Sequence, residues 1–429
     1  EALTKPGVKR TLFDPACGTG GMLSVAEDHL RDMNPQAHLE VFGQELNAET
    51  YATCRADMMV KGQDATHIGL GNSFSEDRFE GQTFDYLMAN PPFGLEWKKV
   101  ERLVKDEAAS QGFAGRFGAG LPRINDGSFL FLQHMIHHMK PADRGGSRLA
   151  IVFNGSPLFT GAAGSGESEI RRWIIENDWL DAVIALPDQL FYNTGISTYV
   201  WIVTNRKSPG RRGTVQLIDA RDLFVKRSKS LGDKRKDIGA EQMAEITRLY
   251  HDHAPGERVK IFPNTAFGFL RITVERPLKL RWRLSDAALV ALEAGKAWQQ
   301  LLKSGAVEGS PRDLYGPEGR FAALFDRTWP SAAAMQADLT ADMGGGVPAA
   351  LIKDLVKLAA TSDPDGELQT DKHGRQLPDP DLRDQENVPL PDAPVAFERD
   401  VAGRLASPAY RAAIDAYMAA EVLPYVPDA

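Results

Sequence analysis

A short turn, Asn90-Pro91-Pro92-Phe93, combines an amide, two prolines and an aromatic ring directly after an apolar run at residues 84–89. The apolar run predicts a buried strand. Two consecutive prolines cannot continue a sheet ladder and they fix φ, so the turn must be stiff. It presents the Asn90 amide and the Phe93 ring together at the carboxyl end of a strand, where open α/β sheets bind their ligands. Considered alone, these residues fit an ordinary turn with Phe93 in the core equally well.

A glycine-rich loop, DPACGTGG at residues 14–21, connects an expected strand at 10–13 to an expected helix at 22–30. Its glycines let the backbone approach a ligand closely, and the following helix points its N-terminal amides at that ligand. The loop lacks the Gly-Lys-Ser/Thr of a P-loop and the GxGxxG spacing of a dinucleotide site. Because Asp14 repels a pyrophosphate but attracts an ammonium group, a cationic ligand of the amino-acid type fits best. A tight strand-to-helix turn without a ligand is the alternative.

Two further expected strands also end in residues that suit a ligand. Glu45 follows an expected strand at 38–43, and Asn72 and Phe74 follow one at 67–70. An acid at the tip of the second strand of a doubly wound sheet accepts hydrogen bonds from ribose hydroxyls. A polar residue beside an apolar ring suits a purine. The set predicts a ribose-bearing ligand, although Glu45 alone is also an ordinary acid at the start of a helix.

In this order and spacing, the motifs resemble the S-adenosylmethionine-dependent amino-methyltransferases that modify adenine N6 in DNA. Within that class the chain looks most like the modification (M) subunits of type I restriction-modification systems. The resemblance continues in DGSFLFLQHMIHHMK at 126–140, in 170–191 (ending IALPDQLF), in ERPL at 275–278 and in PDPDLRDQENVP at 378–389. It implies an α/β fold, with a Rossmann-like methyltransferase sheet covered by helices on both faces and a mainly helical C-terminal region after it.

The resemblance also implies the cofactor, S-adenosylmethionine, and assigns residues to it. Asp14 and the backbone at Ala16, Gly18 and Gly20 would hold the methionine end. Glu45 would hold the ribose. Three residues would lie near the cofactor adenine: Asn72, Ser73 and Phe74. Many relatives carry Asp where this chain has Asn72, and an amide can still donate to a ring nitrogen or accept from an amino group.

The turn at Asn90 gains a catalytic role from the same resemblance. Adenine N6 is a poor nucleophile because its lone pair is delocalised into the ring. The Asn90 oxygen and the Pro91 carbonyl can accept the two amino hydrogens and aim that lone pair at the methyl group. Pro92 keeps the turn stiff, Phe93 would stack on the extruded base, and Phe159 is our candidate for a second aromatic there. No metal is needed, because the sulfonium is its own activated leaving group.

Three histidines, at 134, 137 and 138, lie on an expected helix at 129–140. Their spacing offers no acidic or cysteine partner, so we interpret them as core and surface residues and predict no metal site. The stretch 94–125 has weak periodicity and scattered glycines. A loop of that length after a catalytic turn is usually functional, and in this family it would cover the target base. A disordered surface loop is the alternative.

The remaining segments predict the domain organisation. Dense β-branched and aromatic residues predict further strands of one sheet at 148–153, 180–186, 198–204 and 213–219. Helical spacing at 285–304, about 330–342 and 348–361 predicts a helical region. We expect a DNA methyltransferase domain at 1–280, a helical region at 281–361, a Pro- and Asp-rich arm or linker at 362–394, and C-terminal helices at 395–405 and 408–421 within 395–429.

Charge and cysteine content limit the classes of protein. The net charge of −8 argues against DNA binding by bulk attraction, since that requires clustered cations. One basic segment, 206–236, holds eleven lysines and arginines against three aspartates, and we expect it either to contact phosphates or to form a solvated surface. Two cysteines cannot form a disulfide framework, which indicates a reducing cytoplasm. The sequence shows no membrane span or signal peptide.

The expected partners follow from the resemblance. We find no target-recognition domain, so sequence choice would belong to a specificity (S) subunit that holds this chain, a second copy of it and double-stranded DNA, with a restriction (R) subunit joining them. The family's subunits begin with a helical domain that this sequence lacks, so we expect an N-terminal portion to be missing. The segment of Phe-Tyr-Thr-Pro type that usually closes over the methionine end is absent too. The alternatives are a non-catalytic scaffold subunit, a solitary adenine methyltransferase, and a protein or RNA amino-methyltransferase.

Overall fold

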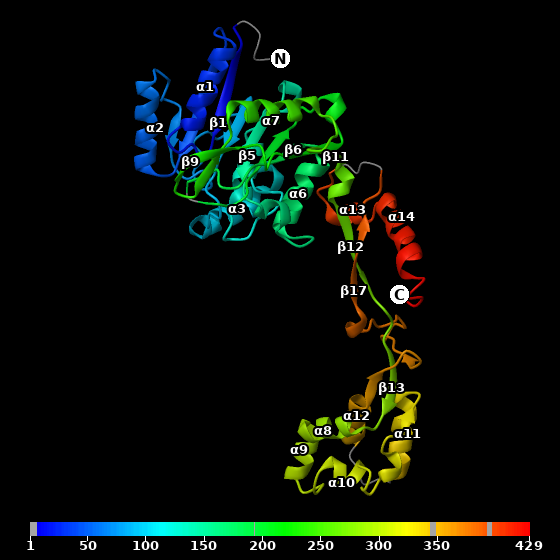
Figure 1. Ribbon diagram of the computed structural model, residues 1–429. Coiled ribbons are helices and arrows are strands. Elements are labelled where there is room, and N and C mark those ends of the chain that lie inside the picture. The colour runs from blue at the N-terminus through cyan, green and yellow to red at the C-terminus, as the bar shows by residue number, and fades with distance from the viewer. Residues whose placement is uncertain (1–6, 193, 344–348, 393–396) are drawn as a thin grey trace. The chain divides into compact units, whose positions relative to one another are not determined.

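The computed structural model describes residues 7–192, 194–343, 349–392 and 397–429. The chain forms two compact units (Figure 1). The first unit contains residues 1–269 and 389–411, and the second contains 270–388 and 412–429. The chain therefore enters the second unit after residue 269, returns to the first at 389, and ends in the second. The expected division at 280, 361 and 394 remains a prediction.

The first unit is built on a nine-stranded mixed sheet with the order β11-β8-β6-β7-β5-β4-β1-β2-β3. The strands β3, β2, β1, β4 and β5 are parallel, whereas β7 runs antiparallel to both β5 and β6. The predicted α/β class is confirmed. The strand bounds are β1 Lys9–Asp14, β2 His38–Glu45, β3 Ile68–Leu70, β4 Tyr86–Ala89, β5 Arg148–Phe153, β6 Leu180–Ala185, β7 Tyr199–Thr204, β8 Thr214–Asp219 and β11 Val259–Pro263.

Helices cover both faces of this sheet, because successive residues of a central strand point to opposite sides. On β1, Leu12 packs in a cluster with Leu23 and Met58, whereas Phe13 packs in another with Val104 and Leu130. A strand buried on both faces needs an unbroken apolar run, and residues 12 and 13 belong to one. The covering helices are α1 Gly21–Met33 and α2 Ala48–Val60 on one face, and α3 Glu101–Gln111, α4 Ser128–His137 and α6 Gly166–Glu176 on the other.

The segment 94–125 is not the unstructured loop that its weak periodicity predicted. It contains α3 and two short 3₁₀ turns, at Lys98–Val100 and Gly112–Ala114. Val104 is fully buried in the main core, and an ion pair between Glu107 and Arg116 attaches the end of the segment to α3. A helix that buries one residue among many charges carries a weak periodic signal, which explains the error.

The rest of the first unit includes a two-stranded hairpin, β9 Val225–Leu231 with β10 Lys234–Asp237, and the helices α5 Ser156–Phe159 and α7 Ala240–Asp252. The returning segment contributes α13 Val401–Leu405, which is shorter than the expected helix at 395–405, part of which lies outside the described residues. Arg404 on α13 lies 3.5 Å from Glu176 on α6.

The second unit has its own core around Trp282, Trp298 and Tyr315. The expected helices are present there as α8 Asp286–Ala294, α9 Lys296–Lys303, α11 Ala332–Met343 and α12 Ala349–Leu358, with the short α10 Pro311–Tyr315. The expected last helix is α14 Pro408–Tyr417, which spans both units and continues as a π-helical turn to Val422.

The Pro- and Asp-rich stretch 362–394, which we predicted to be an arm or a linker, contains paired strands in its described part. Within its described part, β15 Ala360–Ser362 and β16 Glu367–Leu368 pair with β13 Lys279–Arg283, and so does β14 Thr328–Trp329. Further on, β17 Asp384–Pro389 pairs with β12 Phe269–Val274. The stretch has few apolar residues of its own, and it is ordered by backbone pairing with strands that its sequence does not reveal. Of all the helices described, not one is long and apolar enough to cross a membrane.

Candidate active site

The first strand ends in a buried acid. Asp14 is 2% exposed, and its Oδ1 accepts a hydrogen bond from the backbone N–H of Ala16 at 2.9 Å. Burial raises the pKa of Asp14 to about 7; the Ala16 bond opposes this shift and the charge of Glu45 adds to it. Among the described residues, no lysine or arginine pairs with Asp14. A cationic ligand group beside this carboxylate would stabilise its ionised form, in agreement with the ligand type predicted from sequence.

The loop after Asp14 requires glycine at two positions. Gly18 and Gly20 have φ values of 56° and 77°, in the left-handed region that side chains disfavour. Gly20 also has no space for a side chain, because a Cβ there would lie 2.7 Å from the Sγ of Cys54 on α2. Gly20 caps the N-terminus of α1. The loop therefore packs tightly against α2 and leaves the first amides of α1 at its surface.

Glu45 joins this loop to the ends of two other strands. Its Oε2 accepts from the backbone N–H of Gly18 at 3.0 Å, and its Oε1 accepts from Asn47 at 2.8 Å. Its backbone carbonyl accepts from Gly71 N–H, after β3, at 3.0 Å. Each carboxylate oxygen keeps a second lone pair, so Glu45 can hold the loop and still accept from a ligand hydroxyl.

The residues after β3 are oriented by their own hydrogen bonds. Asn72 Oδ1 accepts from Phe74 N–H at 2.9 Å, and Ser73 Oγ donates to the Pro15 carbonyl at 2.6 Å. Phe74 is 3% exposed and packs against Phe131, with ring centroids 4.5 Å apart. Ser73 therefore connects this turn to the glycine-rich loop after β1. The expected roles of Asn72, Ser73 and Phe74 at a cofactor adenine remain predictions.

Arg116 supports this turn from the neighbouring segment, and the sequence analysis did not identify it. Its guanidinium donates to the carbonyls of Ser73 and Phe74 at 2.6 and 2.9 Å. It also forms a bidentate ion pair with Glu107 on α3, and the two side chains are 10% and 15% exposed. Nothing in the spacing around Arg116 reveals this role, because its partners come from three separate segments.

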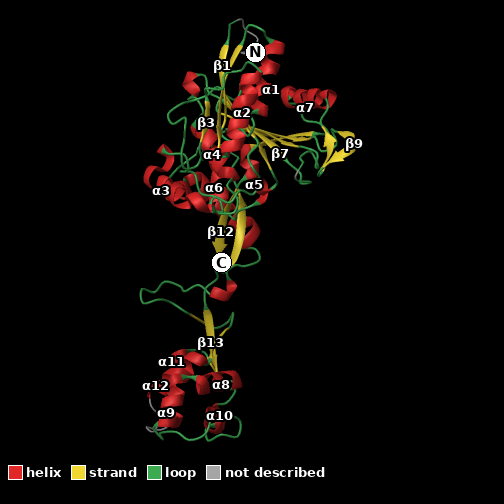
Figure 2. Ribbon diagram, turned by 90° about the vertical axis from the view of Figure 1, so that its left-hand side faces the viewer, coloured by secondary structure: helices red, strands yellow, loops and turns green. Residues whose placement is uncertain are grey.

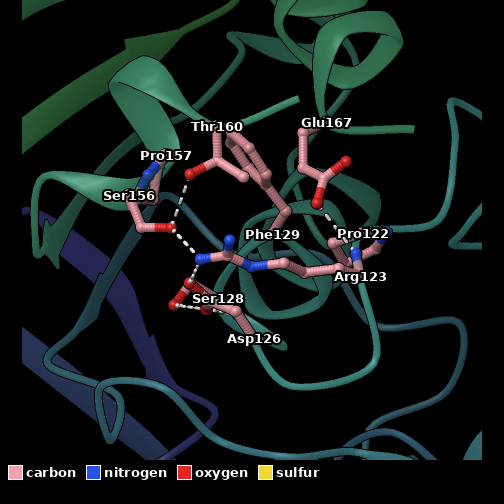
Figure 3. A pocket seen from close by; sticks show the side chains of 9 residues that line it. All are labelled: Pro122, Arg123, Asp126, Ser128, Phe129, Ser156, Pro157, Thr160 and Glu167. Carbon is pink, nitrogen blue, oxygen red and sulfur yellow. Dashed lines mark hydrogen bonds and ion pairs between the residues drawn. The ribbon is translucent and has the colours of Figure 1, made fainter. Parts of the chain in front are cut away.

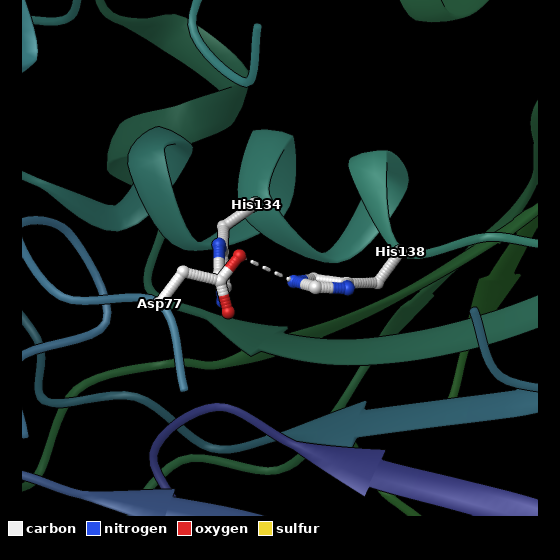
Figure 4. A group of neighbouring side chains, drawn as sticks. All are labelled: Asp77, His134 and His138. Atoms are coloured by element: carbon white, nitrogen blue, oxygen red, sulfur yellow. Dashed lines mark hydrogen bonds and ion pairs between the residues drawn. The ribbon is translucent and has the colours of Figure 1, made fainter. Parts of the chain in front are cut away.

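A second connection uses the histidines of α4 (Figure 4). Asp77, His134 and His138 place one donor atom each within 4.8 Å of one another, so the fold supplies the acidic partner that the sequence did not show. Asp77 Oδ2 lies 3.0 Å from His138 Nε2, while His138 Nδ1 donates to the Gln82 carbonyl at 2.7 Å. Burial opposes ionisation of Asp77, but its hydrogen bonds with His138 and the Phe79 N–H, together with the charge on His138, lower the pKa of Asp77.

The contacts of His134 disfavour a metal ion in this cluster. Its Nδ1 lies 3.3 Å from Arg116 Nη1, which can only donate, so the neutral ring carries its proton on Nε2. Burial lowers the pKa of His134 well below its usual value. A metal ion would meet a protonated nitrogen and a nearby guanidinium. The cluster therefore holds the turn at 77–82 to α4, and the absence of a metal remains a prediction.

The Asn-Pro-Pro-Phe turn follows β4, as expected. Asn90 is exposed, and its side chain has no hydrogen-bond partner in the part of the chain that the structure describes. Pro91 is buried, Pro92 is exposed, and Phe93 is half-buried. The chain just after the turn is held by two backbone bonds, from Trp97 N–H to the Ile124 carbonyl at 3.0 Å and from Gly127 N–H to the Leu95 carbonyl at 2.8 Å. The turn thus presents a free amide on a fixed backbone.

The aromatic neighbour of Phe93 is Phe191, whose ring is edge-on to it at a centroid distance of 5.9 Å. Phe159, the residue predicted from sequence, ends α5 with 80% of its surface exposed. Among the described residues, no ring contact joins Phe159 to Phe93. Sequence reasoning missed Phe191, although IALPDQLF ends in it.

Beside α5 lies a small pocket in which Arg123 reaches across to Ser156, with Nη2 and Oγ 2.7 Å apart (Figure 3). The backbone N–H of Arg123 donates to Glu167 Oε1 at 2.9 Å. These bonds connect the segment before α4 to α5 and α6. They fix the position of α5, so the exposed Phe159 projects from an anchored helix.

Comparison with known proteins identifies the relatives of this chain. The family model described as N-6 DNA Methylase matches residues 2–266. The MjaIX methylase subunit of a type I restriction enzyme from Methanocaldococcus jannaschii is 29% identical over 252 residues, which cover 58% of this chain and 42% of that protein. The HindI methylase subunit from Haemophilus influenzae is 32% identical over 247 residues, covering 56% and 50%.

A solved structure agrees with these relatives. The crystal structure of a type I restriction-modification methyltransferase subunit from Streptococcus thermophilus matches with a TM-score of 0.51 and 28% identity, covering 61% of this chain and 51% of that one. The chain therefore spans about half the length, or less, of the relatives it matches.

Asp14 generates a pH-dependent prediction. Its native pKa of about 7 lies above the ordinary value, so the native state holds this proton at pH values where the unfolded chain has lost it, and stability falls as pH rises. Asp14→Asn removes that dependence while keeping an acceptor for Ala16. As pH rises from about 5 to about 8, the free energy of unfolding of the variant should increase by roughly 2–3 kcal/mol relative to that of wild type, as measured by urea unfolding. Asp32→Asn, at an exposed position on α1, is the control. Parallel wild-type and variant profiles would refute the assignment.

Arg116 generates a second prediction. Arg116→Met leaves Glu107 without its cation and two carbonyls without donors, so the free energy of unfolding should fall by about 3–5 kcal/mol. Combining it with Glu107→Leu should recover part of the loss, because no unpaired charge then remains. Arg31→Met is the control: Arg31 pairs with Glu27 but is 56% exposed, and its loss should change stability by less than about 0.5 kcal/mol. Urea unfolding measures all four proteins, and an Arg116→Met variant as stable as the control would contradict this role.

Proposed function

The chain belongs to the N-6 DNA methylase family, and on that premise we propose that it transfers a methyl group from S-adenosylmethionine to the N6 amino group of a flipped adenine in DNA. One observation carries the proposal. β1 lies between β2 and β4, so the candidate cofactor residues Asp14 and Glu45 and the candidate catalytic residue Asn90 follow the carboxyl ends of three neighbouring parallel strands. Ligands of open α/β sheets bind at that edge, where the strand order reverses.

The cofactor residues fit S-adenosylmethionine. A buried carboxylate that pairs with no lysine or arginine among the described residues suits the ammonium of the methionine end, and Glu45 suits the ribose hydroxyls. The amides at the start of α1 lie behind a loop whose glycines allow close approach. When bound, the cofactor supplies a methyl group already activated by its positive sulfur.

The Asn90 amide and the Pro91 carbonyl prepare the acceptor nitrogen. Two acceptors that hold the amino hydrogens free the lone pair of N6 from the ring without removing a proton first. The prolines hold both acceptors in place before the base binds. The rate enhancement would therefore come from positioning and from preorganised electrostatics. Phe93 provides a face for the flipped base, and the edge-on contact with Phe191 makes Phe191 a stronger candidate than Phe159 for the second ring.

We also propose that the protein acts within a type I complex, as the modification subunit. This rests on relatives that are named methylase subunits of type I restriction enzymes. Its partners would then be double-stranded DNA, a specificity subunit that holds two copies of this chain, and a restriction subunit, in the cytoplasm. Sequence choice would belong to the specificity subunit.

The catalytic assignment predicts the effect of one substitution. Asn90→Ala removes an acceptor from an exposed position, so it should leave the fold and cofactor binding intact and lower methyl transfer by at least about 100-fold. Transfer of labelled methyl groups to plasmid DNA, with the specificity subunit present, measures the rate, and calorimetry measures S-adenosylmethionine binding. Full activity in Asn90→Ala would overturn the mechanism. Label on cytosine, RNA or protein with wild type would overturn the substrate, and no transfer at all would favour a scaffold.

We expect the specificity subunit to dock on the second unit. The chain enters the second unit along β12 and leaves it along β17, and these two strands pair with each other. Arg271 Nε on β12 lies 3.1 Å from Asn387 Oδ1 on β17. A short Gly/Ser linker can therefore replace residues 270–388, with the chain ended after residue 411. We expect this variant to bind S-adenosylmethionine but to lose the specificity subunit in a pull-down. If assembly survives, the docking site lies in the first unit instead.

A further inference from the structure

The clearest cationic surface of the chain is the β9–β10 hairpin, residues 225–237. All seven residues of β9 are exposed. A two-stranded hairpin with no covered face is at best marginally stable alone, so other contacts must hold it. Figure 2 shows the hairpin, labelled β9, projecting from the first unit beside β7 and α7. β9 is therefore open to a partner, whereas Lys234 and Lys236 on β10 pack over the rings of Tyr192 and Phe224.

The charges on the hairpin are only partly neutralised. Arg227 and Lys234 pair with Asp237, and Lys236 pairs with Asp188. The three remaining cations are exposed and have no acidic partner among the described residues: Lys226, Lys229 and Arg235. In a chain with a net charge of −8, solubility does not call for such a cluster. The arrangement instead suits an anionic partner.

The hairpin is attached to the segment that carries Phe191. The Gln189 carbonyl accepts from the backbone N–H groups of Arg235 and Lys236 at 3.0 and 3.3 Å, and the Tyr192 carbonyl accepts from Asp233 at 2.9 Å. Gly232, with φ of 59°, allows the approach, because a Cβ there would lie 2.4 Å from the Tyr192 carbonyl oxygen. The hairpin position is therefore set by residues 189–192.

The same segment lies at the candidate catalytic turn, where the Phe191 ring contacts Phe93. One short segment thus connects the ring of Phe191 to a hairpin that carries three cations without acidic partners among the described residues. A base flipped toward Phe93 remains covalently attached to its backbone, so the flanking phosphates must pass close to this segment.

We propose that the β9–β10 hairpin contacts the DNA backbone next to the flipped adenine, through Lys226, Lys229 and Arg235. The proposal rests on the proposed function, since it presumes that DNA is the substrate. Ser228 and Ser230 lie on the same face of β9 as Lys226, because every second residue of a strand shares a face, and hydroxyls together with cations are the usual phosphate contacts. A two-stranded ribbon also has a shape that fits against a duplex. If the partner were instead an acidic protein surface, nothing would require the hairpin to be attached to the segment that contacts Phe93.

The test reverses the three unpaired cations together, as Lys226→Glu/Lys229→Glu/Arg235→Glu. Binding to a fluorescein-labelled mixed-sequence duplex should weaken at least about tenfold at low salt, and the slope of log K against log salt should flatten by roughly 2–3. Binding of S-adenosylmethionine should not change. The matched control is Lys9→Glu/Arg144→Glu/Lys260→Glu, whose three exposed cations also lack acidic partners in the described chain. It changes the net charge equally but should leave the slope within experimental error of wild type.

Four outcomes would overturn the proposal. Equal slopes for the two triple variants would mean that only net charge matters. Unchanged DNA binding with loss of the specificity subunit in a pull-down would assign the hairpin to a protein partner. If wild type itself neither binds nor methylates DNA, the proposed function fails as well. If wild type methylates DNA and the hairpin variant does so with unchanged affinity, the hairpin proposal fails alone.

Discussion

Glu45 is the residue on which the geometry of the site depends. Its two carboxylate oxygens accept from the loop after β1 and from the turn after β2, and its backbone carbonyl accepts from the turn after β3. Three strand-end turns are thus joined at one residue. A carboxylate that accepts backbone N–H groups forms stronger hydrogen bonds than a neutral side chain can. Since Gly18 is in the left-handed region, the Glu45 bond also stabilises a loop conformation that is otherwise unfavourable in a flexible chain.

A second set of contacts holds the site from the opposite side. Arg116 and the pair Asp77–His138 attach the turns after β3 to α3 and α4. These groups are largely buried, and a buried charge that loses its partner is strongly destabilising. The turns after β3 are therefore held in place, because removing either contact would leave buried groups unpaired. Rigid supports of this kind allow Asn90 to remain without a partner.

The sequence predicted the elements whose members are neighbours in the chain. The strands, the glycine loop and the Asn-Pro-Pro-Phe turn are local patterns, in which each residue constrains the next through φ, sterics or alternation. Arg116 lies 43 residues from Ser73, and Asp77 lies 61 residues from His138, so no spacing rule relates them. The same limit explains why Phe191 was missed, because its contact with Phe93 joins residues that are far apart in the sequence. Pairing across the chain also explains the ordered stretch at 362–394, because its backbone bonds to β13 and β12 depend on partners distant in sequence.

A free amide oxygen at Asn90 also bears on which base the site accepts. The oxygen is exposed in the free protein, so it is hydrated and its lack of a partner carries little penalty. When a base enters, Asn90 and the Pro91 carbonyl lose that water. The amino group of adenine or cytosine would return two hydrogen bonds, whereas the carbonyl oxygen at the corresponding position of guanine or thymine would set acceptors against an acceptor, at about 1–3 kcal/mol for each unpaired group. On the proposed mechanism, two acceptors would therefore favour adenine or cytosine when the base presents that edge. The choice between a purine and a pyrimidine then falls to the rings that cover the base, and the edge-on pair of Phe93 and Phe191 is the part of the described structure placed to make it.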